Sequence, residues 1–110
     1  MPKLLKPTLR ERNRYLVFEA MSDNALERKD VVDAVWSSLL RLYGEVGAAK
    51  TSLWVMDWDA KKKMGILKVN HKSVDTMRSA ATMVKEINGK RTSVNILRVT
   101  GTLRKARQNL

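Results

Sequence analysis

Residues 93–107 read Ser-Val-Asn-Ile-Leu-Arg-Val-Thr-Gly-Thr-Leu-Arg-Lys-Ala-Arg, and they combine a strand pattern with a basic segment. Its first half alternates apolar and polar residues with a period of two, which is typical of a half-buried strand. Gly101 then interrupts the pattern before a short basic segment. A strand of the sheet therefore leads directly into a cationic surface, which favours a polyanionic partner. Four positive charges lie within ten residues, with no carboxylate after residue 93: Arg98, Arg104, Lys105 and Arg107.

Three further segments have strand patterns, and two helical patterns separate them. We predict strands at residues 14–21, 50–58, 61–70 and 92–100, with a tight turn at Asp59 and Ala60 joining the second to the third. The order β-α-β-β-α-β indicates an α+β fold of the ferredoxin-like, RRM-like type. In such a sandwich, a four-stranded antiparallel sheet carries two helices on one face, and a short basic C-terminal segment follows here.

Both helices are predicted from their ends and their apolar spacing. The first follows a capping box at Asn24 and Glu27 and stops near Gly44 and Gly47. The second is capped by Ser73 and runs to the Asn-Gly pair at residues 88–89. Helical spacing assigns two sets to the core: Val32, Val35, Trp36, Leu39, Leu40 and Tyr43, then Met77, Ala80, Ala81, Val84 and Ile87.

Composition narrows the class of protein. The 110 residues carry 22 Lys and Arg against 11 Asp and Glu, a formal net charge of +11, which favours nucleic acid as the partner. The absence of cysteine excludes thiol catalysis and Cys-ligated zinc. No apolar run approaches the ~18 to 20 residues of a membrane span. We expect a cytoplasmic protein that does not bind a membrane.

The chain divides into three parts. Residues 1–13 form a basic, extended N-terminal arm that contains both prolines, Pro2 and Pro7. Residues 14–100 form a single α+β domain, and residues 101–110 form the basic C-terminal segment.

The sheet face without helices is expected to be unusually apolar. If Lys68 and Arg98 avoid the core, the two-residue period of a strand places Ile66, Val94 and Ile96 on this open face. Such a patch marks an interaction site, for which the candidate protein-interface residues are Trp54, Met56, Trp58 and Ile66. Two alternatives stay open: the C-terminal segment folds over this face, or the register of the second strand is shifted by one.

The predicted fold is similar to an RNA recognition motif, which stacks unpaired bases on aromatic side chains of its central strands. Residues 63–70, Lys-Met-Gly-Ile-Leu-Lys-Val-Asn, keep a basic residue and a glycine of that motif but none of its aromatics. We therefore expect RNA contact through Lys and Arg side chains rather than base stacking.

Three blocks carry a more specific resemblance. They are Leu-Lys-Pro-Thr-Leu-Arg-Glu-Arg-Asn-Arg-Tyr-Leu at 5–16, Gly-Ile-Leu-Lys-Val at 65–69 and Val-Thr-Gly-Thr-Leu-Arg-Lys-Ala at 99–106. In this order they resemble the signature blocks of the ribonuclease P protein component 2 family, and the compact length resembles its archaeal branch. Thr100 and Lys68 depart from the residues common there but keep the hydroxyl and the charge.

This resemblance implies a noncatalytic RNA-binding subunit of ribonuclease P. It implies that a catalytic RNA removes the 5′ leader from precursor tRNA, and that this RNA requires Mg²⁺ while the chain binds no cofactor. The implied partners are the ribonuclease P RNA, precursor tRNA and protein component 3, a TIM-barrel-like subunit, with self-association into a heterotetramer. The candidate RNA-binding residues are Arg10, Arg12, Arg14, Lys68, Arg98, Arg104 and Lys105.

Two other classes remain. One is a general RNA-binding or ribosomal protein of RRM-like fold. The other is a stand-alone nuclease, for which Asp57 and Asp59 with His71 are the best candidates. Nothing in the sequence orients these three side chains, so we predict no catalytic and no metal-binding residue.

Overall fold

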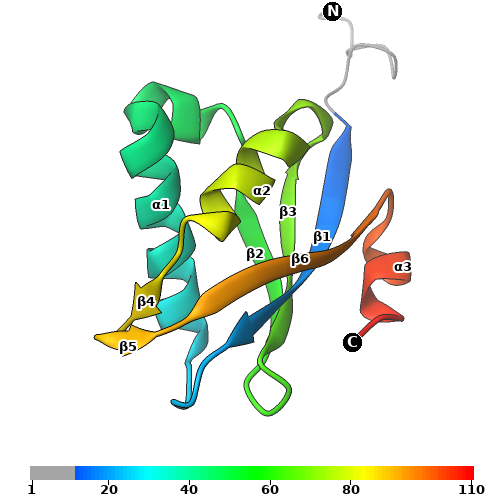
Figure 1. Cartoon of the computed structure of the whole chain (residues 1–110). Coiled ribbons are helices and arrows are strands. Elements are labelled where there is room, and N and C mark those ends of the chain that lie inside the picture. The colour runs from blue at the N-terminus through cyan, green and yellow to red at the C-terminus, as the bar shows by residue number, and fades with distance from the viewer. Residues whose placement is uncertain (1–11) are drawn as a thin grey trace, which may run out of the picture.

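A computed structural model describes residues 12–110, and four of its strands form one antiparallel sheet (Figure 1). These strands are β1 (Asn13–Met21), β2 (Trp54–Asp59), β3 (Met64–Asn70) and β6 (Ser93–Thr100), in the order β2-β3-β1-β6. With α1 (Arg28–Ala49) after β1 and α2 (Val74–Thr82) after β3, the chain order matches the predicted β-α-β-β-α-β. The predicted α+β fold is confirmed. The second and third strands are shorter than predicted, because residues 50–53 and 61–63 lie outside the sheet.

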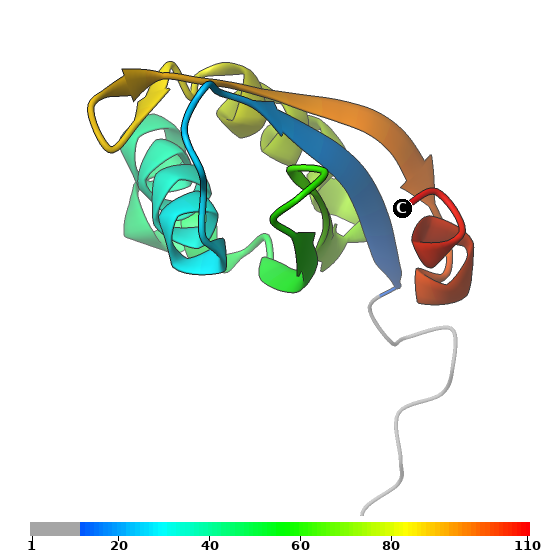
Figure 2. The ribbon, with the colours of Figure 1, turned by 90° about the horizontal axis from the view of Figure 1, so that it is seen from below.

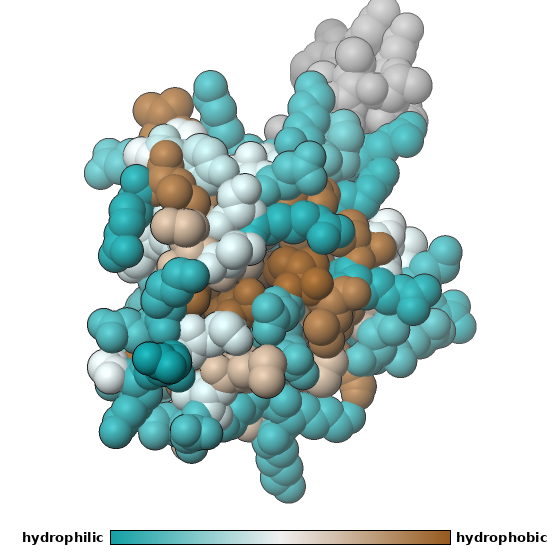
Figure 3. Space-filling view, in the orientation of Figure 1, coloured by the Kyte–Doolittle hydropathy of each residue, from teal (hydrophilic) through white to brown (hydrophobic). Residues whose placement is uncertain are grey.

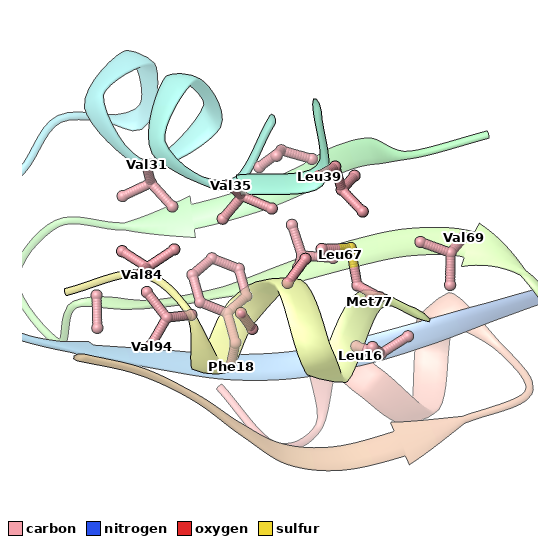
Figure 4. Packing of buried hydrophobic residues seen from close by; sticks show 14 of the residues in the cluster. Leu16, Phe18, Val31, Val35, Leu39, Leu67, Val69, Met77, Val84 and Val94 are labelled. Atoms are coloured by element: carbon pink, nitrogen blue, oxygen red, sulfur yellow. The ribbon is translucent and has the colours of Figure 1, made fainter. Parts of the chain in front are cut away.

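One face of the sheet is buried beneath α1 and α2. Figure 4 shows side chains from both layers meeting there, among them Leu16 and Phe18 of β1 with Val35 and Leu39 of α1. All four are inaccessible to solvent. Burying large aliphatic and aromatic side chains supplies the main favourable free energy of folding, so this cluster is the core that holds the helices on the sheet.

The ends of α1 differ from their prediction. The capping box forms one turn later than expected, between Glu27 and Asp30, where the Glu27 backbone N–H donates to Asp30 Oδ2 over 3.0 Å. This bond lowers the pKa of Asp30, and a bond from Asn88 contributes. Gly44, at a φ of 71°, breaks the helix as predicted, but a further helical turn follows to Ala49.

Trp36 and Tyr43 were assigned to the core stripe, and that assignment is wrong. Their exposed fractions are 37% and 40%, whereas Val31, one position before the predicted stripe, is fully buried. The buried stripe is therefore rotated about the helix axis relative to the prediction, which leaves a tryptophan at the surface.

The second helix is shorter than predicted. It ends at Thr82, although Val84 and Ile87 are still buried in the same core. The pair Asn88 and Gly89 does not terminate a helix: it has φ angles of 55° and 78° and joins β4 (Glu86–Ile87) to β5 (Lys90–Arg91). Two successive positive φ angles are the requirement of a type I′ hairpin turn, which Asn-Gly satisfies better than other pairs.

Two β-bulges overturn the predicted faces of β2 and β6. Met56 is the extra residue in β2, so Trp58 lies opposite Gly65 on the helix side and not on the open face. Leu97 is the extra residue in β6, so Val94 and Ile96 belong to the helix-side core while Arg98 faces outward as predicted. A bulge inserts one residue and reverses the alternation beyond it, which period-two counting cannot anticipate.

Gly65 lets two aromatic rings meet across the central strand. It lies between Phe18 on β1 and Trp58 on β2, whose rings stack with centroids 5.8 Å apart and an interplanar angle of 16°. A Cβ on Gly65 would lie 2.8 Å from Phe18 ring carbons and 2.5 Å from the Asp57 carbonyl oxygen. Trp58 Nε1 also donates to the Leu26 carbonyl over 3.1 Å, which fixes its ring on the helix side.

Candidate RNA-binding surface

A third helix covers part of the open face of the sheet. α3 (Leu103–Arg107) follows β6 and lies on the other side of the sheet from α1 (Figure 2). Thr102 caps it, accepting the Lys105 backbone N–H at Oγ1 over 3.2 Å. Ala106 forms a small second core with Val17 and Ile66, and all three are inaccessible to solvent. Leu103, Leu110, Tyr15, Met56 and Met64 pack around this core, half-buried.

The interface predicted for this face is therefore mostly internal. Ile66 faces away from α1 and α2 as expected, but α3 buries it completely, and Met56 packs under the same helix. Together with the inward position of Trp58, this leaves Trp54 as the one exposed member of the predicted set, at an exposed fraction of 63%. The alternative in which the C-terminal segment folds over the sheet is confirmed.

An ion pair fastens α3 to the strand at the sheet edge. Arg107 Nε donates to Asp57 Oδ2 over 2.8 Å, and Nη2 donates to Oδ1 over 3.2 Å. These hydrogen bonds, with the charge of Asp57, raise the pKa of Arg107. Lys62 Nζ donates to the Leu110 carbonyl over 2.5 Å and ties the residues after α3 to the β2–β3 turn. The sequence pattern did not reveal this role of Arg107, because Asp57 is 50 residues away in the chain.

Four of the predicted RNA-binding residues form a group that we call the α3 rim: Lys68, Arg98, Arg104 and Lys105. Lys68 and Arg98 flank β1 on the open face, opposite Tyr15 and Val17 respectively. Arg104 and Lys105 are exposed on α3. Arg98 Nη1 makes one long contact of 3.4 Å with Asn109 Oδ1, which carries no charge. The fold thus brings together cations from β3, β6 and α3 around the edge of the small core.

The remaining predicted cations lie at the start of β1. Arg12 is exposed, and Arg14 is half-buried with its Nη1 donating to the Asn13 carbonyl over 2.9 Å. Arg10 lies outside the described residues, as does most of the predicted N-terminal arm.

The cations of the described chain are almost entirely free of carboxylate partners. Within residues 12–110 the Arg107–Asp57 pair is the only salt bridge. Figure 3 shows hydrophilic residues over most of the visible face, with apolar side chains gathered near its middle. Unpaired positive charge that faces solvent attracts polyanions and contributes little to folding, so this surface is suited to binding RNA phosphates.

The residues considered for a nuclease are not brought together. Asp57 pairs with Arg107, and Asp59 Oδ1 accepts the backbone N–H groups of Lys61 and Lys62 over 3.0 and 3.2 Å. His71 follows the other end of β3 and contacts the Arg12 carbonyl through its backbone N–H over 2.7 Å. In the described part of the chain, no three His, Asp or Glu side chains cluster as a metal site would require.

An apolar groove lies between α1 and the edge strand β2. Trp36 and Trp54 line it together with Val32 and Leu53. Arg28 also lines the groove and donates from Nη2 to the Val55 carbonyl, so part of the open edge of β2 is already hydrogen-bonded. Trp36 was assigned to the core from its spacing, so the sequence pointed to only one of these two tryptophans as a surface residue.

Comparison with known proteins identifies relatives over nearly the whole chain. The model of a family described as Rpp14/Pop5 matches residues 14–110. The chain is 36% identical to ribonuclease P protein component 2 of Thermococcus kodakarensis over 107 residues, covering 97% of this chain and 89% of the relative. It is 37% identical to the protein of that name from Pyrococcus horikoshii, covering 96% and 88% respectively. The resemblance seen in the three sequence blocks is confirmed.

A solved structure with a similar fold is a chain of yeast ribonuclease MRP. It aligns with a TM-score of 0.70 at 20% identity, covering 86% of this chain and 77% of the yeast chain. At that identity the likeness supports the fold alone. Within residues 12–110, no helix is both long and apolar enough to cross a lipid bilayer.

Proposed function

The chain belongs to the Rpp14/Pop5 family, and we propose that it is a noncatalytic, RNA-binding protein subunit of ribonuclease P. The observation that carries this proposal is its similarity, over 97% of its length, to a protein named ribonuclease P protein component 2. The α3 rim supports it, because a group of unpaired cations on a rigid scaffold can neutralise RNA phosphates. We propose a cytoplasmic location for the complex.

In this role the protein supports a catalytic RNA that removes the 5′ leader of precursor tRNA. Hydrolysis of a phosphodiester needs an activated water and positive charge on the developing oxyanions, which metal ions provide. The dispersed carboxylates of residues 12–110 support the part of the proposal in which the RNA holds the required Mg²⁺. The cations of the protein would reduce repulsion between RNA segments and between RNA and its substrate.

The proposal includes a protein partner, protein component 3 of ribonuclease P, with self-association into a heterotetramer. The groove that holds Trp36 and Trp54 supports a protein contact, because exposed tryptophans frequently dominate the binding energy of protein interfaces. The edge hydrogen bond from Arg28 disfavours strand addition there, so we expect side chains of the partner to enter the groove.

Affinity purification of the tagged chain from cells tests the proposal. We expect one discrete structured RNA, able to process precursor tRNA, together with a second protein subunit. Recovery of ribosomal subunits instead would support the alternative, a general RNA-binding or ribosomal protein of RRM-like fold.

A further inference from the structure

A second cationic region lies at the end of the sheet opposite Arg12. β1 ends there at Met21, which pairs with Ser93 at the start of β6. A groove of about 740 Å³ opens between the β2–β3 turn, the segment after α2 and the strand β5. We call it the turn groove, and its basic residues are Lys62, Lys63, Lys85 and Arg91.

The basic residues of the turn groove outnumber its acidic residues. The acidic residues that line it are Glu19 and Asp23, two against four cations. Neither carboxylate forms a salt bridge with a cation of residues 12–110. The groove therefore presents net positive charge along a concave surface, where field lines are focused and an anion is attracted more strongly than on a convex one.

Backbone oxygens hold the two lysines of the β2–β3 turn in place. Lys63 has a φ of 55° in the turn before β3, and its Nζ donates to the Ser22 carbonyl across the groove. Lys62 Nζ contacts the Leu110 carbonyl. The Ser22 carbonyl is an uncharged acceptor, so Lys63 is oriented while its positive charge remains available. Lys85 and Arg91 are exposed on either side of the Asn-Gly hairpin, and Ser93 adds a neutral hydroxyl at the groove wall.

We propose that the turn groove binds the phosphate backbone of RNA as a second site, separate from the α3 rim. Four cations from three chain segments suit several successive phosphates better than one small anion. Lys68 and Arg98 of the α3 rim pair with Tyr15 and Val17, whereas the turn groove lies at Met21, so at a rise of ~3.3 Å per residue the two sites are roughly 13–20 Å apart along β1. Two sites on one sheet would let one protein hold two RNA segments at a fixed separation. This inference rests on the proposed function, since it assumes an RNA partner.

Salt-dependent binding to a transcript of an archaeal ribonuclease P RNA tests the site. The groove variant is Lys85→Gln with Arg91→Gln, and the control is Lys29→Gln with Arg41→Gln on α1. All four residues are exposed, and each pair lowers the net charge by two, so the variants differ in location alone. Each phosphate contact contributes ~0.7 to 0.9 to the slope of log affinity against log salt, so the groove variant should flatten it by about 1.4 to 1.8. The control should leave it within about 0.5. Equal slopes in the two variants would overturn the proposal.

The absence of cysteine allows a second, independent test. Single substitutions Ser93→Cys in the groove, Gln108→Cys after α3 and Ser37→Cys on α1 each give a unique thiol for a tethered iron chelate that cleaves nearby RNA. We expect cleavage at one set of nucleotides from position 93, at a different set from position 108, and only background from position 37. Cleavage from position 108 with only background from position 93 would contradict RNA binding in the turn groove and leave the proposed function standing. An absence of any complex with the RNA would overturn both.

Discussion

Replacing Gly65 with alanine tests whether the glycine of β3 exists to let Phe18 and Trp58 stack. The new Cβ would lie 2.5 Å from a backbone oxygen and 2.8 Å from the Phe18 ring, and the backbone oxygen cannot rotate away. Overpacking of this kind costs ~1–3 kcal/mol, and loss of an aromatic pair costs a further ~0.5–1.5 kcal/mol. Alanine recovers ~0.5–1 kcal/mol over glycine in a strand. We expect a net destabilisation of about 1–3 kcal/mol.

Urea unfolding followed by tryptophan fluorescence measures this loss. With an m-value of ~1–3 kcal/mol per molar urea, the midpoint should fall by about 1 M. Gly101→Ala is the matched control, since a Cβ there would meet no atom within 4 Å, and its midpoint should change little. If both alanine variants unfold at the same midpoint, the explanation of Gly65 is wrong. Phe18→Leu should relieve part of the clash, so the two substitutions together should cost less than the sum of each alone.

Three further predictions follow from the open face and from α1. Ile66→Asp should destabilise the fold by at least ~3 kcal/mol, because it leaves an unpaired charge in the core beneath α3; an unchanged unfolding midpoint would show that α3 does not cover this residue. Arg104→Gln with Lys105→Gln should flatten the salt slope of RNA binding by about 1.4 to 1.8 with folding intact, and an unchanged slope would remove both residues from the RNA site. The hydrogen bond from the Glu27 backbone N–H holds the folded-state pKa of Asp30 below its usual value, so its carboxylate contributes stability above about pH 4 that is lost as the pH falls through the folded value. Asp30→Asn should therefore show a weaker loss of stability between pH 5 and pH 3 than the wild type, as measured by unfolding at each pH.

The fold could be predicted from the sequence because its signals are local. Alternating apolar residues placed all four sheet strands, and helical spacing placed both crossover helices. The errors arose where one extra residue in a strand reverses which face of the sheet the following side chains occupy. Met56 and Leu97 are bulged, and nothing in their own residue types distinguishes a bulge from a regular position. Asn88 and Gly89 could have been read correctly, since Asn-Gly favours a hairpin at least as strongly as it favours a helix end.

The functional surface was less predictable, because it depends on contacts between distant segments. A cationic tail after Gly101 was evident, but the ion pair that holds α3 against β2 joins residues 57 and 107. The same holds for the turn groove. Lys62 and Lys63 form an obvious basic run, yet only the folded chain places Lys85 and Arg91 beside them. Sequence similarity, in contrast, indicated the family without knowledge of any of these contacts.

Cleavage of a precursor tRNA tests the central claim most directly. The reaction is measured with the protein alone, with the ribonuclease P RNA alone across a range of Mg²⁺ concentrations, and with the two combined together with the partner subunit. We expect no cleavage by the protein alone, and we expect the complex to remove the 5′ leader at lower Mg²⁺ than the RNA alone. An Asp59→Ala, His71→Ala variant should support the complex as the wild type does. Cleavage by the protein without RNA, lost in that variant, would contradict the claim that this chain is a noncatalytic subunit.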